Sequence, residues 1–181
     1  MLAPSRQSLL RNWWPVVFWL GVIRAESTDT ASAANTGALL YKVIATIAPH
    51  VEPTSVELLN LVLRKMGHFI GYGMLSALVL LALRNTNRDR LRKLLPRPWG
   101  IYLRDCWRAE WALLSVLLTL VTAAFDEIHQ TFIPSRTGCW QDVVLDTCAA
   151  VIVQVLIYLF SSRAIRQKRM PVTQTELSST S

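Results

Sequence analysis

The stretch MGHFIGYGMLSALVLLAL, residues 66–83, decides how the rest of the sequence is interpreted. It contains no Asp, Glu, Lys or Arg, and a helix of about 20 predominantly apolar residues matches the hydrocarbon thickness of a bilayer. Between positions 84 and 108 there follow eight Arg or Lys residues and only two Asp residues. Because cytoplasmic loops of membrane proteins carry a surplus of Arg and Lys, these two segments predict a transmembrane helix that ends in the cytoplasm.

Three further apolar blocks, at about residues 12–26, 109–125 and 143–160, predict three more transmembrane helices. The chain is 52% hydrophobic with a mean hydropathy of +0.32, which is high for a soluble domain of 181 residues. We therefore predict an all-α, polytopic integral membrane protein with four transmembrane helices in one domain, residues 1–162. The inner (plasma) membrane is the expected location.

Basic residues also predict where the chain ends lie. The last apolar block is followed by Arg163, Arg166, Lys168 and Arg169. These residues would hold the C-terminus in the cytoplasm, and four spans then place the N-terminus there too. Because residues 163–181 become rich in Ser and Thr after the basic run, we expect them to form a disordered cytoplasmic tail.

The first apolar block has two interpretations. Arg6 and Arg11, the apolar run and the later Ala31-Ser32-Ala33 fit a cleavable signal peptide. Alternatively the block is a transmembrane helix, with its tryptophans at the inner interface and Arg24 reaching the outer one. We prefer the helix, and either interpretation places the following segment outside the cytoplasm.

Residues 37–49 form a moderately apolar stretch that is too short to span a bilayer and contains Lys42. This pattern is typical of a short interfacial or re-entrant helix. Pro53 and the spacing Thr54-x-x-Glu57 then indicate the start of the next helix, with a capping box.

Charge and composition exclude several classes of protein. The net charge of +7 lies between and after the apolar blocks, so it is explained by topology and does not indicate nucleic-acid binding. The three cysteines, Cys106, Cys139 and Cys148, have no CxxC spacing, and we interpret them as packing residues. The sequence contains no HExxH, GxSxG or P-loop motif, so we predict no cofactor and no dedicated metal centre.

Polar residues gather at the outer ends of the predicted helices. Lys65, His68 and Tyr72 have the spacing of one helix face. The third span ends in DEIHQ, residues 126–130, and a short turn with Pro134 and Gly138 would hold Arg136 close to the carboxylates. An ionised group at the centre of a transmembrane helix costs about 2.5 to 3.5 kcal/mol, so Asp146 requires a partner, expected to be Arg136, Lys65 or His68. Glycines at 67, 71 and 73 would let a neighbouring helix come close.

The pattern Lys65-x-x-His68-Phe69-x-x-Tyr72, then Asp126-Glu127-x-His129-Gln130-x-Phe132-x-Pro134-x-Arg136, then Asp142 and Asp146, resembles the signature of the VanZ-like family. The resemblance covers about residues 10–162 and departs from the family at Cys148-Ala149-Ala150, where members often have Asn or a small polar residue. The family is named for a membrane protein associated with low-level resistance to the glycopeptide teicoplanin. It implies a cell-envelope protein, linked to glycopeptide antibiotic susceptibility, with this site: Lys65, His68, Tyr72, Asp126, Glu127, Gln130, Arg136, Asp142 and Asp146.

Three interpretations of the cluster stay open. It is a structural staple that fixes helix packing, a binding site for an anionic lipid-linked or cell-wall-related molecule, or the active site of an intramembrane hydrolase acting on lipid-linked phosphate or glycan. The catalytic candidates are His68, Asp126, Glu127, Asp142 and Asp146, and the oxygens of the four carboxylates could also receive a divalent cation that bridges phosphate. His129, a lone histidine beside a turn, is expected to be solvated. Expected partners are membrane lipids and a second copy of the chain, but no nucleic acid.

Overall fold

The computed structural model describes residues 6–28, 33–48, 50–94, 107–134, 136 and 138–167. Every regular element in these residues is an α-helix, which confirms the predicted all-α class. The helices are α1 (Arg6–Glu26), α2 (Ala33–Ile47), α3 (Pro53–Leu94), α4 (Ala109–Gln130) and α5 (Trp140–Gln167). Cys106 and the part of the predicted tail after residue 167 lie outside the described residues, whereas residues 163–167 continue α5.

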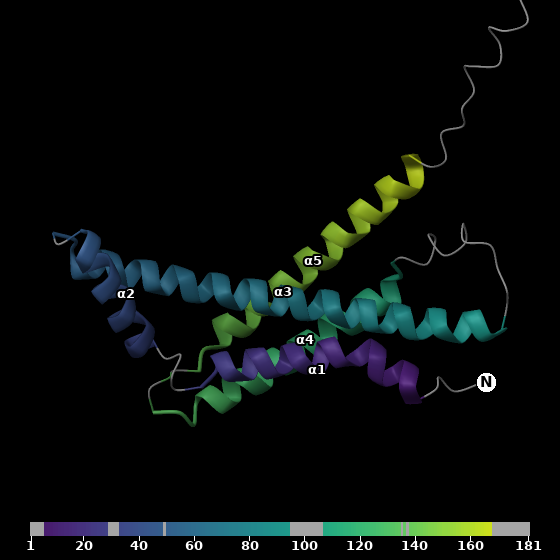
Figure 1. Cartoon of the computed structure of the whole chain (residues 1–181), viewed down its shortest axis with the longest axis horizontal. Coiled ribbons are helices and arrows are strands. Elements are labelled where there is room, and N and C mark those ends of the chain that lie inside the picture. The colour runs from purple at the N-terminus through teal and green to yellow at the C-terminus, as the bar shows by residue number, and fades with distance from the viewer. Residues whose placement is uncertain are drawn as a thin grey trace, which may run out of the picture.

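Helix α3 is the centre of the arrangement and contacts each of the other four helices. With 42 residues it is about 63 Å long at 1.5 Å per residue, roughly twice the hydrocarbon thickness of a bilayer. Helices α1 and α4 lie along its second half, and α5 crosses it and diverges (Figure 1). Helix α2 packs on the first turns of α3, in the place where a short interfacial helix is predicted (Figure 1).

Three helices in the described part, not the four predicted, are long and apolar enough to cross a membrane: Pro53–Asp89, Ala109–Gln130 and Trp140–Arg163. The prediction that residues 12–26 of α1 form a transmembrane span was therefore wrong. That helix has 21 residues, but Arg11 and Arg24 confine its apolar run to residues 13–23, which include three Trp residues and Pro15. Its length is sufficient for a bilayer, but its mean hydropathy is too low.

Helix α1 is nevertheless part of the folded domain. It places Val16 and Ile23 in the same core cluster as Tyr72 and Leu75 of α3. At its first half, Arg11 and Asn12 both donate to Oδ2 of Asp89 on α3, each at 3.0 Å. These contacts attach α1 to α3 through its core face and its first half.

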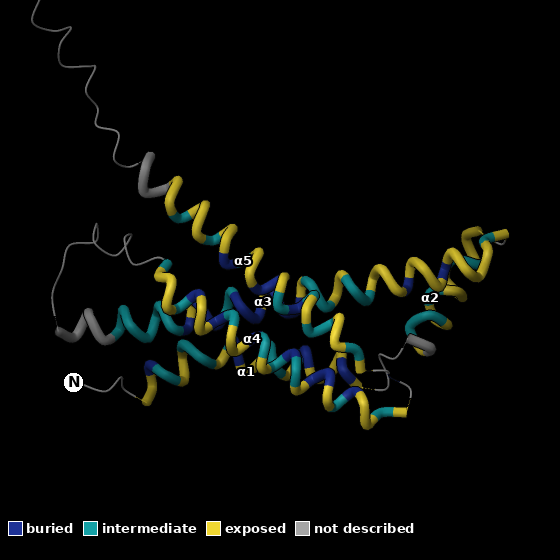
Figure 2. The backbone as a smooth tube through the Cα atoms, turned by 180° about the vertical axis from the view of Figure 1, so that it is seen from behind, coloured by how far each residue is buried: buried dark blue, intermediate teal, exposed yellow. Residues whose placement is uncertain are grey.

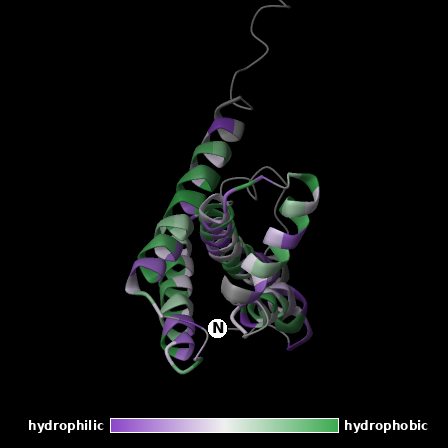
Figure 3. Cartoon of the chain, turned by 90° about the vertical axis from the view of Figure 1, so that its left-hand side faces the viewer, coloured by the Kyte–Doolittle hydropathy of each residue, from purple (hydrophilic) through white to green (hydrophobic). Residues whose placement is uncertain are grey.

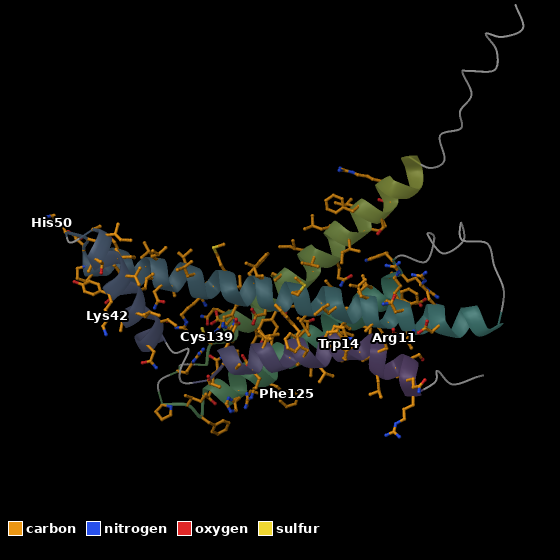
Figure 4. All side chains as sticks on the ribbon, in the orientation of Figure 1. Arg11, Trp14, Lys42, His50, Phe125 and Cys139 are labelled. Carbon is orange, nitrogen blue, oxygen red and sulfur yellow. The ribbon has the colours of Figure 1, made fainter. Side chains whose placement is uncertain are left out.

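Many large apolar side chains lie on the surface and several polar side chains lie inside, the reverse of a soluble helix bundle. Exposed residues recur along the whole length of the helices in Figure 2, and α5 is hydrophobic along most of its visible length in Figure 3. Phe125, labelled in Figure 4, is 69% exposed and Leu113 is 61% exposed, whereas Ser76, Thr119 and Asp146 are fully buried. Large contiguous apolar surface with polar groups inside is typical of a protein that lies in lipid.

Among the glycines predicted to allow close helix packing, only Gly73 does so. A Cβ added at Gly73 would lie 3.1 Å from Cγ2 of Val153 and 3.8 Å from the carbonyl oxygen of Ala149. One turn further along this seam, Nε2 of Gln154 donates to the Ser76 hydroxyl at 2.9 Å and to the Ser76 carbonyl at 3.1 Å. At Gly67 and Gly71 an added Cβ would meet nothing within 4 Å, so these two glycines leave space beside α3.

Replacing Gly73 with leucine is therefore expected to lower the free energy of unfolding by about 1 to 2 kcal/mol, because the side chain would overpack the seam between α3 and α5. Thermal unfolding of the purified protein in detergent measures the change. Gly71→Ala is the matched control and should be as stable as the wild type or slightly more stable, since the site is open and alanine favours the helix. Equal loss in both variants would contradict the seam.

Candidate functional site

The predicted polar residues meet at one end of the helices, where α4 ends and α5 begins; we call it the site end. Cys139 marks this end in Figure 4, and Arg11 lies toward the opposite end. The structure brings together residues from α3 (Lys65, His68, Tyr72), α4 (Asp126, Glu127, Gln130), the following turn (Arg136) and α5 (Asp142, Asp146). Within this set the contacts form two groups, one between α3 and α5 and one between α1 and α4.

The α3–α5 group consists of two pairs, one turn apart. Lys65 Nζ forms an ion pair with Asp142 Oδ1, and His68 Nδ1 lies 3.3 Å from Asp146 Oδ2. Asp146 is fully buried. The prediction that it has a partner from Lys65, His68 or Arg136 is confirmed for His68.

The α1–α4 group is built on Asp126. Its Oδ2 accepts hydrogen bonds from the Ser27 hydroxyl at 2.6 Å and from Gln130 Nε2 at 3.0 Å. Its Oδ1 lies 3.8 Å from NH1 of Arg24. Because both oxygens have partners, Asp126 acts mainly to join the end of α1 to α4, and it is the weakest of the predicted acid–base candidates.

Arg136 lines the same cavity as Asp126, and it also holds the C-terminal end of α1, a role that the sequence did not predict. Its NH2 group donates to the backbone carbonyls of Glu26 at 2.6 Å and Thr28 at 2.9 Å. Glu26 is the last residue of α1, and Thr28 lies just after it. A helix end leaves carbonyl groups without intrahelical donors, and a positive charge is favourable there. The turn after α4 thereby holds α1 in place through one side chain.

Glu127, on the last turns of α4, binds the backbone of the same turn. Its Oε2 accepts the backbone N–H of Cys139 at 2.6 Å, while Oε1 has no hydrogen-bond partner among the described residues. The residue is only 6% exposed. One carboxylate oxygen of Glu127 therefore stabilises the turn, and the other is available to a ligand.

Tyr72 lies between the two groups. Its ring stacks on His68 with a centroid distance of 6.0 Å and an interplanar angle of 22°. The hydroxyl is buried and is close enough to Asp126, Asp146 and Glu127 to interact with their charges. It therefore connects the carboxylates of α4 and α5 through one side chain of α3.

A cavity of about 220 Å³ opens beside Tyr72, between α1, α2, α3 and the turn. Ile23, Glu26, Ser27, Thr36, Arg64, Gly67, His68, Gly71, Tyr72, Asp126 and Arg136 line it. Arg64, Glu26 and Ser27 are lining residues that sequence reasoning missed. Positions 64, 67, 68, 71 and 72 share one helix face, and extending the predicted face of His68 and Tyr72 by one turn would have found Arg64.

A family model described as VanZ/LLP1 matches residues 12–161. The chain belongs to this family. Neither a curated protein nor a solved structure matches the chain. The matched residues of the VanZ-like domain begin in α1 and end in α5, so they include both groups of the site and the cavity.

Two chemical capacities of the VanZ-like domain follow from this geometry. The cavity presents guanidinium and imidazole groups that can donate to an anion. The α3–α5 group presents carboxylate oxygens and an imidazole nitrogen that can take up protons or a cation. His68 belongs to both, because it lines the cavity and contacts Asp146.

Proposed function

We propose that this VanZ-like domain is an integral membrane protein of the cell envelope whose cavity binds the anionic group of a lipid-linked or cell-wall-related molecule. The main support for this proposal is the position of Arg64 in the cavity. Its side chain lines the cavity and is half-buried, yet no carboxylate among the described residues lies within 4 Å of it. An arginine in a partly apolar cavity without a protein counter-ion is suited to bind a phosphate or carboxylate with paired hydrogen bonds.

The surroundings of Arg64 support a lipid-linked ligand. A second cavity of about 560 Å³, between α2 and α3, shares Arg64 with the first. Its wall includes Tyr41, Val56 and Leu61, so an apolar chain has room beside the charged group. Ligand sites commonly combine such apolar walls with a few convergent polar groups.

The proposed orientation places the cavity outside the cytoplasm and both termini inside it, in the inner membrane. Support comes from the eight basic residues between positions 84 and 108 of the sequence. Five of them lie in the last turns of α3, which ends, as α4 begins, opposite to the site. An outward site is accessible to intermediates of envelope assembly. A link to glycopeptide susceptibility, teicoplanin in particular, is the corresponding cellular proposal.

Filling the cavity tests the proposal. Gly67→Leu places a side chain in the cavity at a position where nothing lies within 4 Å, so the fold should tolerate it. We expect the variant to bind a polyprenyl phosphate in detergent at least fivefold more weakly than the wild type, because the leucine takes part of the ligand's volume. Binding is measured by titration with the lipid.

Gly21→Leu is the matched control, since an added Cβ there also meets nothing within 4 Å and the residue does not line the cavity. It should bind as the wild type does. Wild-type affinity in Gly67→Leu would contradict the proposal. In cells, the proposal also predicts that Gly67→Leu, but not Gly21→Leu, changes the teicoplanin concentration that inhibits growth.

A further inference from the structure

His68, Glu127 and Asp142 bring three metal-binding side chains to one point from three different helices. One donor atom of each lies within 4.8 Å of the other two. In a tetrahedral site with bonds of about 2.1 Å the donors are about 3.4 Å apart, so a cation requires small side-chain rotations and no backbone movement. The sequence predicted that all three residues lie at the same end of the helices, but it could not predict which of the candidate side chains converge.

A second observation indicates that this group is made for a ligand. Glu127 is 94% buried, being 6% exposed, and its Oε1 has no hydrogen-bond partner among the described residues. A buried carboxylate oxygen without a partner is costly and rare in folded proteins. A bound cation would give this oxygen a partner.

The orientation of His68 also fits a metal ligand. Its Nδ1 faces Asp146 Oδ2 at 3.3 Å, which leaves Nε2 as the second nitrogen of the ring. Histidines that bind metals usually donate their other ring N–H to a carboxylate, which fixes the tautomer and makes the ligand more basic. Fully buried Asp146 is placed to do this, so it acts as a positioning residue.

Three carboxylates lie close together around the group. Glu127, Asp142 and Asp146 are three carboxylates, and the described ion pairs give them one lysine, Lys65, and the ring of His68. Carboxylates held this close in a partly buried site repel one another unless positive charge is added. A divalent cation supplies that charge at the point where the three donors meet.

We propose that His68, Glu127 and Asp142 bind one divalent cation, with Asp146 orienting His68. A donor set of one imidazole nitrogen and two carboxylates favours Mn²⁺ or Zn²⁺ over Mg²⁺ or Ca²⁺, which prefer oxygen alone. Because His68 also lines the cavity, the cation would lie at the cavity wall and offer an open position to an anionic ligand. This last point rests on the proposed function, whereas the cation site itself does not.

Mn²⁺ alone, added to the purified full chain without lipid phosphate, tests the site. Electron paramagnetic resonance measures free Mn²⁺, and we expect one bound ion per wild-type chain. His68→Ala and Asp142→Asn should bind at least tenfold more weakly, and His129→Ala, which removes a nearby histidine outside the group, should bind as the wild type does. Asp142→Asn is a small change at a partly exposed residue, so this variant should fold. If His68→Ala does not fold, the Mn²⁺ affinity of Asp142→Asn tests the cation site.

Lys65→Ala separates a cation site from an ordinary ion-pair network. The lysine competes with the cation for Asp142, so its removal should tighten Mn²⁺ binding severalfold. Absence of Mn²⁺ binding by the wild type, or equal binding by His68→Ala and His129→Ala, would overturn the inference. Binding of lipid phosphate in the presence of a chelator shows separately whether the cavity binds the anion without a cation.

Discussion

Gly138→Ala is expected to lower the free energy of unfolding by about 3 kcal/mol, the largest loss expected from adding a methyl group at any glycine that the structure describes. A Cβ at position 138 would lie 2.6 Å from the backbone carbonyl oxygen of Glu127 and 2.6 Å from Cγ2 of Thr131. The threonine side chain can rotate, but the carbonyl belongs to the last turns of α4 and cannot yield. The turn would therefore shift and break the bond from the Cys139 N–H to Glu127 Oε2.

Thermal unfolding in detergent, followed by circular dichroism, measures this loss. Gly67→Ala is the control, because an added Cβ there meets nothing within 4 Å and should leave stability unchanged or slightly raised. Wild-type stability of Gly138→Ala would mean that the turn between α4 and α5 does not pack against α4 as described.

Arg64→Gln is expected to weaken binding of a polyprenyl phosphate by about 10- to 100-fold. A hydrogen bond that involves a charged group contributes about 1.5 to 3 kcal/mol, and arginine makes two such bonds to one phosphate. Glutamine keeps a similar length and some hydrogen bonding but removes the charge. The expected loss is therefore in affinity, with folding unaffected, because no protein carboxylate among the described residues depends on Arg64.

Lys42→Gln provides a control for charge alone. Lys42 lies on α2 at the same end of the molecule, points away from the bundle in Figure 4 and does not line the cavity. Titrations at several salt concentrations should show wild-type affinity for Lys42→Gln. If both variants lose affinity equally, the attraction is a general surface effect and the cavity is not the binding site.

The all-α class and the helices could be predicted from the sequence because apolar blocks and basic loops report directly on bilayer thickness and charge asymmetry. The number of spans was overestimated at α1. Three tryptophans and a proline in α1 were counted as part of an apolar run, but they contribute little to its hydropathy. Arginines also limit the run at both ends. Length alone does not make a helix a candidate span.

Within the site, spacing predicted which residues share a helix face but could not predict which side chains pair. The partner of Asp146 was narrowed to three residues, and the structure identifies His68. Arg136 was predicted to lie near the carboxylates. Its NH2 group also binds the end of α1, a contact that spacing cannot predict because the two segments are far apart in the sequence. Ser27, 99 positions from Asp126, was missed for the same reason.

The glycines show a related limit of pattern reasoning. Gly67 and Gly71 have the spacing of a helix-packing motif, but they open the cavity, and Gly73 makes the close contact instead. Small residues permit either close packing or empty space. Only the position of the neighbouring helix decides which of the two occurs.

We propose that the guanidinium group of Arg64 receives the anionic group of the ligand. Solid-state NMR dephasing between ³¹P of a bound polyprenyl phosphate and ¹⁵N-labelled arginine side chains detects this contact, in the wild type and in Arg64→Gln. We predict strong dephasing in the wild type, retained in Lys42→Gln and lost or greatly reduced in Arg64→Gln. Dephasing that is absent in the wild type, or unchanged in Arg64→Gln, would contradict the claim.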